Sequence, residues 1–142
     1  MKIALVGSAP SSIRSAPCQD EAYVEFVQGR PLLEKHQYPF REDNWEIWAC
    51  SPGTFGVLTR INRFFEMHRW EPGQTWFSPE YCDWLREFHG PVYTTEKIPE
   101  IKNSVRIPRE ELVREFGPYF WTSSLSFMAG LAIMEIMAAR KQ

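Results

Sequence analysis

The sequence lacks any long hydrophobic run. No stretch approaches the roughly 18 consecutive apolar residues that a membrane-spanning helix requires. Residues 1–7 are too short to hold the apolar core of a signal peptide. We therefore expect a chain without a membrane partner that resides in the cytoplasm.

The sequence also lacks an excess of basic residues. Its 16 Lys and Arg stand against 18 Asp and Glu, which gives a formal net charge of -2, and no basic stripe is visible. Proteins that bind nucleic acids usually carry such a stripe or patch. We therefore do not expect a nucleic-acid partner.

Cysteine is scarce and unpaired in its spacing. The three cysteines, Cys18, Cys50 and Cys82, are odd in number and far apart, which indicates reduced thiols. There is no C-x-x-C or H-x-x-x-H pair, so we expect no metal site. The dinucleotide fingerprint G-x-G-x-x-G and the P-loop ending G-K-[ST] are missing as well, so no cofactor is identified by motif.

Short apolar runs and turn residues are present instead, and they predict alternating strands and helices. Ser78-Pro79 marks a helix start, since serine caps helices and proline fits their first position. A second helix, long and apolar, is expected from Thr122 to Arg140. Strands are expected at residues 2–6, 45–50, 63–69 and 91–94, with a short edge strand at 104–107.

This alternation predicts one α/β domain over residues 1–142, with an open parallel sheet of four to five strands. We expect strand 2–6 at the centre of the sheet, with 45–50 and 63–69 to one side. The long helix should pack across one face. Its inward residues are predicted to be Leu125, Met128, Ala129, Ala132, Ile133 and Ile136.

Three of the predicted strands end in small or turn-forming residues: GSAPSS, CSPG and HRWEPG. The carboxyl ends of parallel strands share one edge of the sheet, where ligands bind. Gly7 with Ser8, Ser11 and Ser12 could hold an anion beside a helix start, although this stretch alone fits a plain capped turn better. Thr122-Ser123-Ser124 offers three hydroxyls at a helix start, one of which serves as the cap.

The third predicted strand contains two ionisable residues. Strand alternation places Glu66 and His68 on one face, with Trp70 just beyond. A histidine near a strand end, two residues from a carboxylate, suits acid/base catalysis or ligand recognition. A buried histidine bonded to a carbonyl, with Glu66 paired to an arginine, is an equally good interpretation.

The stretches VGSAPSS, WEIWACSPG, RFFEMHRWEPG and PYFWTSSLSFMAGLAI resemble uncharacterised Rossmann-like proteins of tailed phages. More distantly, their order is similar to the 6-hydroxymethylpterin diphosphokinase-like proteins and to bacterial sialyltransferases that use CMP-sialic acid. The resemblance implies a three-layer, Rossmann-like fold with flanking helices. It also implies a nucleotide or nucleotide-sugar ligand.

In those transferases Gly-Asn-Gly-Pro-Ser, Cys-Asn and Thr-Ser-Gly surround the nucleotide. The resemblance carries these roles onto three segments here, namely Gly7, Ser8, Ala9, Pro10 and Ser11; Cys50 and Ser51; and Thr122, Ser123 and Ser124. Ser8 and Ser51 replace asparagines, and Ala9 replaces a glycine, so recognition of the base or sugar should differ.

Residues 19–42 are interpreted as an insertion relative to this family. Both enzyme groups continue after the long helix with a further strand, whereas this chain ends at Gln142, so the last part of the family fold is expected to be missing. A second copy of the chain, or residues 19–42, is therefore expected to cover the apolar helix.

Three hypotheses for function follow. The first is a phage-encoded protein that binds or sequesters a nucleoside phosphate in the host cytoplasm. The second is a nucleotide-dependent transferase, or a fragment of one, with His68 and Glu66 as acid/base residues. The third is a self-assembling structural protein, supported by an exposed-looking aromatic set, although such a set more often belongs to the core: Trp76, Phe77, Tyr81 and Trp84.

Overall fold

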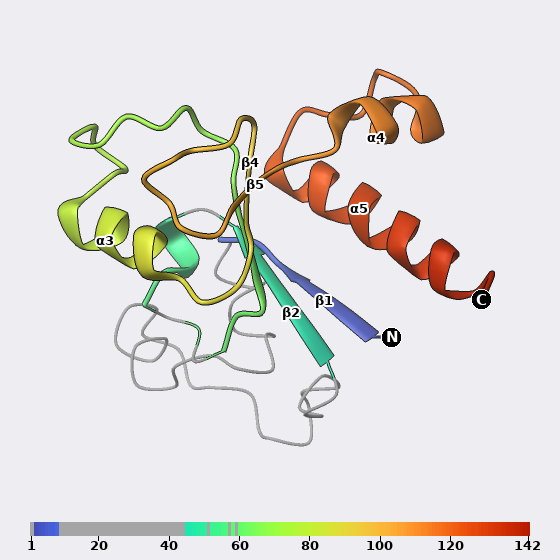
Figure 1. The fold of residues 1–142 in the computed structure, drawn as a ribbon, viewed down its shortest axis with the longest axis horizontal. Coiled ribbons are helices and arrows are strands. Elements are labelled where there is room, and N and C mark those ends of the chain that lie inside the picture. Colours follow the sequence, from blue (N-terminus) through green and yellow to red (C-terminus); the bar gives the residue numbers. More distant parts are fainter. Residues whose placement is uncertain (1, 9–44, 51, 57, 59) are drawn as a thin grey trace.

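The computed structural model describes residues 2–8, 45–50, 52–56, 58 and 60–142, and within them it contains a five-stranded parallel sheet (Figure 1). Each strand pairs with the next one along the chain. The strands are β1 (Lys2–Val6), β2 (Trp45–Cys50), β3 (Arg63–Glu66), β4 (Val92–Thr94) and β5 (Ser104–Arg106). The predicted α/β class and the parallel direction of the strands are confirmed.

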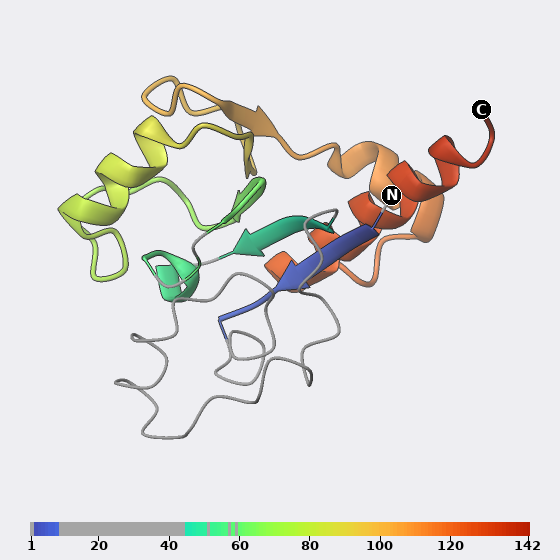
Figure 2. The same cartoon turned by 90° about the horizontal axis from the view of Figure 1, so that it is seen from below.

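Helices cover both faces of the sheet and give three layers (Figure 2). They are η2 (Pro52–Thr54, a 3-10 turn), α3 (Pro79–Glu87), α4 (Arg109–Phe116) and α5 (Ser124–Ala139). Helix α3 packs on one face, and α5 packs with α4 on the other, where α5 contacts β1, β2 and β3. The architecture is the Rossmann-like, three-layer arrangement that the resemblance implied.

The core divides into two halves because successive side chains of a strand point to opposite faces. On the α3 side, Ala49 and Phe64 pack with the apolar residues of α3. On the α5 side, Trp48 and Phe65 pack with the apolar residues of α5, and their rings stack at 5.5 Å. All four side chains are fully buried, so the central strands hold the layers together.

Helix α3 begins as the sequence predicts. The Ser78 hydroxyl accepts a hydrogen bond from the backbone N–H of Tyr81 at 3.2 Å, and Pro79 occupies the first turn. The helix buries an aromatic face, so the predicted exposed aromatic set is wrong for two members. Phe77 is 0% exposed and Tyr81 is 1% exposed, because both rings pack under the sheet, whereas Trp76 stays half-exposed.

Helix α5 exposes two residues that were expected to face inward. Met128 and Ala132 are buried as predicted, but Leu125 and Ile133 are 45% and 47% exposed. The inward face instead includes Phe127 and Leu131, which pack in one core cluster with Trp48 and Phe65 of the sheet. A Cβ on Gly130 would lie 2.7 Å from the Trp121 ring, so only glycine lets that ring lie against the helix.

Strand β1 lies at an edge of the described sheet and not at its centre, which corrects the predicted order. Each later strand pairs with the strand before it in the chain, whether the connection carries a helix, as residues 67–91 do, or is short, as residues 95–103 are. The chain therefore moves across the sheet in one direction. In agreement with an edge position, Lys2 is exposed and Ile3–Leu5 are only partly buried.

No helix in the described part of the chain is both long enough and apolar enough to cross a membrane. On α5, Leu125, Ile133 and Met137 form an exposed apolar row. The expectation that a second copy or residues 19–42 covers this helix stays a prediction, and residues 19–42 lie outside the described part.

Candidate functional site

A cavity of about 580 Å³ opens at the carboxyl edge of the sheet. Strands β1 to β4 each contribute to its lining at or just after their last residue. The strand-end contributions are Gly7 and Ser8 after β1, Cys50 from β2, Met67 and His68 after β3, and Thr95 after β4, and Arg109 is added by the first turn of α4. The start of α5 closes the cavity with residues 121–125 and Phe127.

The register of the strands explains why these ends meet. Cys50 aligns with Phe65 across β2 and β3, and Thr94 aligns with both Glu66 and Arg106 across the next two pairs. Each strand therefore finishes within one residue of its neighbour in the sheet. This is the convergence that the sequence predicted from its strand-ending motifs.

At the end of β1, Gly7 is buried and Ser8 is exposed. A Cβ on Gly7 would lie 3.3 Å from Cδ1 of Leu125, so the end of β1 and the start of α5 approach closely. The structure thus brings Gly7 and Ser8 together with the α5 start, as predicted. The other predicted residues of this loop, Ala9, Pro10, Ser11 and Ser12, lie outside the described residues.

At the end of β2, the Cys50 side chain is 4% exposed, and its thiol donates to the carbonyl oxygen of Val6 over 3.9 Å. The Cys50 carbonyl oxygen accepts a hydrogen bond from the Thr54 hydroxyl at 3.0 Å. Cys50 thus lines the cavity as a buried, hydrogen-bonded group, while its predicted companion Ser51 lies outside the described residues. Cys82 is buried as well, and its thiol donates to the carbonyl oxygen of Phe77 over 3.6 Å.

At the end of β3, Glu66 and His68 form a hydrogen-bonded pair. The Glu66 side chain is 1% exposed, and its Oε1 lies 2.5 Å from Nδ1 of the half-exposed His68 ring. The same Oε1 accepts the backbone N–H of His68 at 3.0 Å. Because the His68 N–H is bound to a side chain, it does not donate to a neighbouring strand. Strand β3 therefore ends at Glu66 and not at Arg69 as predicted.

The second carboxylate oxygen of Glu66 binds a residue that the sequence did not single out as functional. The Tyr81 hydroxyl, on α3, donates to Oε2 at 2.5 Å. Burial raises the pKa of Tyr81 well above its usual value, and the neighbouring Glu66 charge raises it further. Tyr81 therefore stays protonated and acts as a hydrogen-bond donor.

Trp70 does not line the cavity, although the sequence placed it in the site. Its ring packs edge-on against Phe77 at 5.2 Å and under the Arg86 guanidinium, and it lines a separate groove with Arg69 and residues 95–100. The aromatic residue beside His68 is Trp76, whose ring centroid lies 5.7 Å from that of His68.

At the start of α5, the three predicted hydroxyls have different roles. The Ser123 hydroxyl accepts the backbone N–H of Ser126 at 3.3 Å in a reciprocal capping box, so Ser123 is the cap. Thr122 and Ser124 also line the cavity. Trp121 holds this segment in place, because its Nε1 donates to the Gly117 carbonyl at 2.8 Å and its ring stacks on Phe127.

The lining residues that the sequence did not predict are Met67, Thr95, Arg109, Trp121, Leu125 and Phe127, and Arg109 is the charged one among them. Arg109 is exposed at the start of α4, directly after β5, and lines the cavity. The signal was present: Pro108-Arg109 follows the predicted strand 104–107 as the other site residues follow theirs. That strand was expected only as an edge, so its end was not counted.

Within the residues that the structure describes, no group of three or more His, Cys, Asp or Glu side chains is arranged to hold a metal ion. The described residues that line the cavity instead provide one arginine, several hydroxyls and one carboxylate-bound imidazole.

Comparisons with protein-family models, with curated proteins and with solved structures each found no match for this chain.

Proposed function

We propose that this protein binds a phosphorylated small molecule, most simply a nucleotide or nucleotide sugar, in the cavity at the carboxyl edge of the sheet. The observation that carries the proposal is that the ends of β1 to β4, the first residue of α4 and the start of α5 line one cavity. In open parallel sheets this edge is where ligands bind. Its volume of about 580 Å³ falls within the range usual for small-molecule sites.

The polar lining suits an anion. Arg109 supplies a positive charge, and Ser8, Thr122 and Ser124 supply hydroxyl donors. The N-terminal end of α5, a helix of 16 residues, adds a favourable dipole on the same side. Among the described residues that line the cavity, none is acidic.

The apolar lining suits the remainder of such a ligand. Met67, Trp121, Leu125 and Phe127 form the apolar part of the wall. A base or sugar could pack there while its phosphate faces the arginine, which is the usual division of a ligand site into apolar walls and few polar anchors. On the resemblance to tailed-phage proteins, we further propose that the protein binds or sequesters its ligand in the host cytoplasm.

Calorimetry with a panel of nucleoside mono-, di- and triphosphates, nucleotide sugars and inorganic phosphate tests this proposal. Arg109→Gln should weaken binding of the best ligand about 10-fold, which corresponds to one lost charge-assisted hydrogen bond. The matched control is Arg114→Gln, which removes the same charge from the same helix but does not line the cavity. No binding by any compound, or equal loss in both variants, would contradict the proposal.

One observation favours a second candidate function, a nucleotide-dependent transferase. His68 lines the cavity while its Nδ1 is bound to a buried carboxylate, and this pairing orients an imidazole for proton transfer. In that case His68→Gln should abolish turnover of a nucleotide sugar while leaving most of its binding intact. Product analysis by chromatography provides the readout, and turnover that survives the substitution rules His68 out as the base.

A further inference from the structure

Glu66 is the one charged side chain that is fully buried among the described residues. Burying a carboxylate is costly unless hydrogen bonds replace its lost water. Two donors bind it, the backbone N–H of His68 and the Tyr81 hydroxyl, and Nδ1 of the His68 ring lies within hydrogen-bond distance as well. The arrangement satisfies the carboxylate and commits both of its oxygens.

The Tyr81 hydroxyl cannot easily move away from Glu66, because its ring is packed on several sides. Phe64, Phe77 and Trp84 all lie within ring-contact distance, at centroid separations of 6.0–6.2 Å. The backbone N–H of Tyr81 is bound to the cap residue Ser78. Helix α3 therefore presents a fixed donor to Oε2 of Glu66.

We infer that Tyr81 is a positioning residue that fixes the proton of His68 on Nδ1. A carboxylate has no proton to donate, and the Tyr81 hydroxyl and the main chain hold its two oxygens in place as acceptors, so the group at Nδ1 donates. The neutral imidazole then carries its proton on Nδ1 and leaves Nε2 unprotonated. Within the described residues, Nε2 has no hydrogen-bond partner, and the ring lines the cavity.

This inference rests on the proposed function only for the nature of the ligand, and it assigns the chemistry that the site performs on it. His68 is a proton acceptor for a hydroxyl group of the ligand or for a bound water. In that step the O–H bond breaks, its electron pair stays on the oxygen, and the proton goes to Nε2. The imidazolium that forms keeps its Nδ1–H on Glu66, whose negative charge offsets the new positive charge.

Nitrogen NMR of the unaltered, ¹⁵N-labelled chain tests the inference directly. At about pH 8.5 an ordinary imidazole is neutral, and long-range proton–nitrogen correlations distinguish the protonated from the unprotonated ring nitrogen. His68 is assigned by loss of its signals in His68→Gln, and the exposed His89 serves as an internal reference. We expect the protonated nitrogen of His68 to be Nδ1, and a proton on Nε2 would overturn the inference.

Two variants test whether Tyr81 causes this preference. Tyr81→Phe removes only the hydroxyl and should yield a mixture of both His68 tautomers. Glu66→Gln should do the same, since one amide oxygen cannot accept from three donors. Tyr93→Phe is the matched control, because its hydroxyl contacts Arg63 and not Glu66, and it should leave the tautomer unchanged. An unaltered tautomer in Tyr81→Phe would show that Tyr81 does not position His68.

The measurement on the unaltered chain keeps the inference falsifiable even if a variant does not fold. It also separates the two proposals, since the tautomer is read without any ligand. Absence of nucleotide binding with Nδ1 protonated would contradict the proposed ligand alone, whereas nucleotide binding with Nε2 protonated would contradict this inference alone.

Discussion

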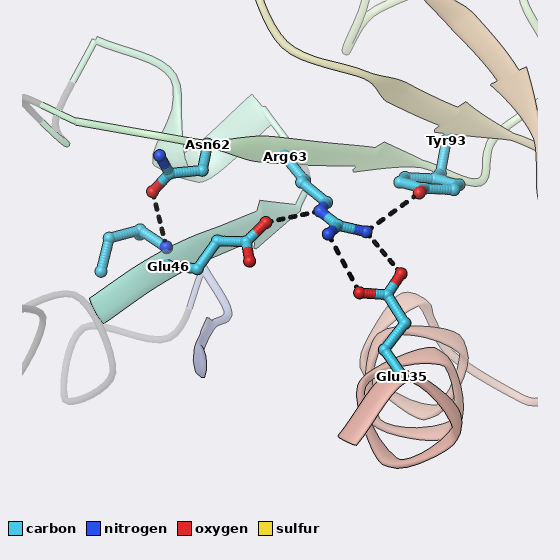
Figure 3. A network of polar contacts seen from close by, with 6 residues as sticks. Glu46, Asn62, Arg63, Tyr93 and Glu135 are labelled. Carbon is cyan, nitrogen blue, oxygen red and sulfur yellow. Dashed lines mark hydrogen bonds and ion pairs between the residues drawn. The ribbon is translucent and has the colours of Figure 1, made fainter. Parts of the chain in front are cut away.

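Strand β3 carries a charged residue at each end, and the two ends are built differently. Arg63, at its start, points to the α5 face, where its guanidinium donates to Glu46 at 2.6 Å and to both carboxylate oxygens of Glu135 at 2.6 and 3.0 Å (Figure 3). It also donates to the Tyr93 hydroxyl at 3.2 Å. Glu66, at its end, points to the α3 face and binds His68 and Tyr81.

We call Arg63 and its hydrogen-bond partners the closed network, because none of them lines the cavity. Its partners come from β2, β4 and α5, and its guanidinium also lies over the Trp48 ring at 4.5 Å. Burial would lower the pKa of Arg63, but the hydrogen bonds to Glu135 and Glu46 outweigh it and raise that pKa, so the charge is permanent. A closed network of this kind joins the layers of the fold.

The Glu66 network is open at one end. Its last member, His68, is half-exposed and lines the cavity. The buried charge of Glu66, bound by Tyr81 and the main chain, thus leads to a solvent-accessible imidazole at the cavity. The difference indicates that the amino end of β3 serves stability and its carboxyl end serves the site.

The largest effect is expected from breaking the closed network. Arg63→Met leaves two partly buried carboxylates, Glu46 and Glu135, facing each other without a cation. Because each is about a quarter exposed, we expect a loss of about 2–4 kcal/mol in the free energy of unfolding, somewhat below a fully buried pair. Urea denaturation measures it, with Arg114→Met as the exposed control, and a loss equal to that of the control would remove the distinction between the two ends.

A smaller effect is expected at the open end. Tyr81→Phe leaves Oε2 of Glu66 buried without its donor, which should lower the free energy of unfolding by about 1–2 kcal/mol near neutral pH. Combined with Arg63→Met, the losses should add to within about 0.5 kcal/mol, because the two networks lie on opposite faces and share no partner. Denaturation of the double variant checks this, and strong coupling would mean that the ends of β3 act as one unit.

At alkaline pH, the free energies of unfolding of the unaltered chain and of Tyr81→Phe should differ less than at neutral pH. The pKa of Tyr81 is raised above its ordinary value of 10.0 in the folded state. Above about pH 10 the unfolded chain loses this proton while the folded chain keeps it, so the free energy of unfolding falls as pH rises, by about 1.4 kcal/mol per pH unit. Tyr81→Phe lacks this decline. Denaturation midpoints at pH 7 and above pH 10 measure it, and a constant difference would contradict it.

Cys82 also makes the free energy of unfolding fall as pH rises, because burial raises the pKa of its thiol above 9.0 in the folded state. Its contribution is present in both chains and cancels in that comparison. Cys82→Ala, measured over the same pH range, separates the thiol from the phenol.

The smallest effect is expected from an exposed ion pair. Arg106 and Glu110 contact each other across one turn at the start of α4, and the backbone and Arg106 hydrogen bonds lower the pKa of Glu110. Because both side chains are more than half exposed, Glu110→Gln should leave the urea midpoint within replicate error. A clear shift of the urea midpoint would mean that this exposed ion pair stabilises the fold as the partly buried Arg63 network does.

Much of the candidate site follows from local sequence. Apolar runs that end before Gly7 and at Cys50 place the ends of β1 and β2, and a parallel sheet then gathers the strand ends on one edge. The Ser78-Pro79 and Ser123 helix starts follow from the chemistry of capping. These features depend on neighbours within a few residues, so the sequence determines them by itself.

Other features depended on contacts between distant segments. The order of the strands placed β1 at an edge, and the packing of α3 brought Tyr81 to Glu66 and Trp76, in place of Trp70, to His68. Arg109 reached the cavity because β5 joined the sheet in register with β4. Local pattern states which residues can form a strand or helix, but the partner of a buried polar group is selected by packing across the layers, which only the tertiary structure decides.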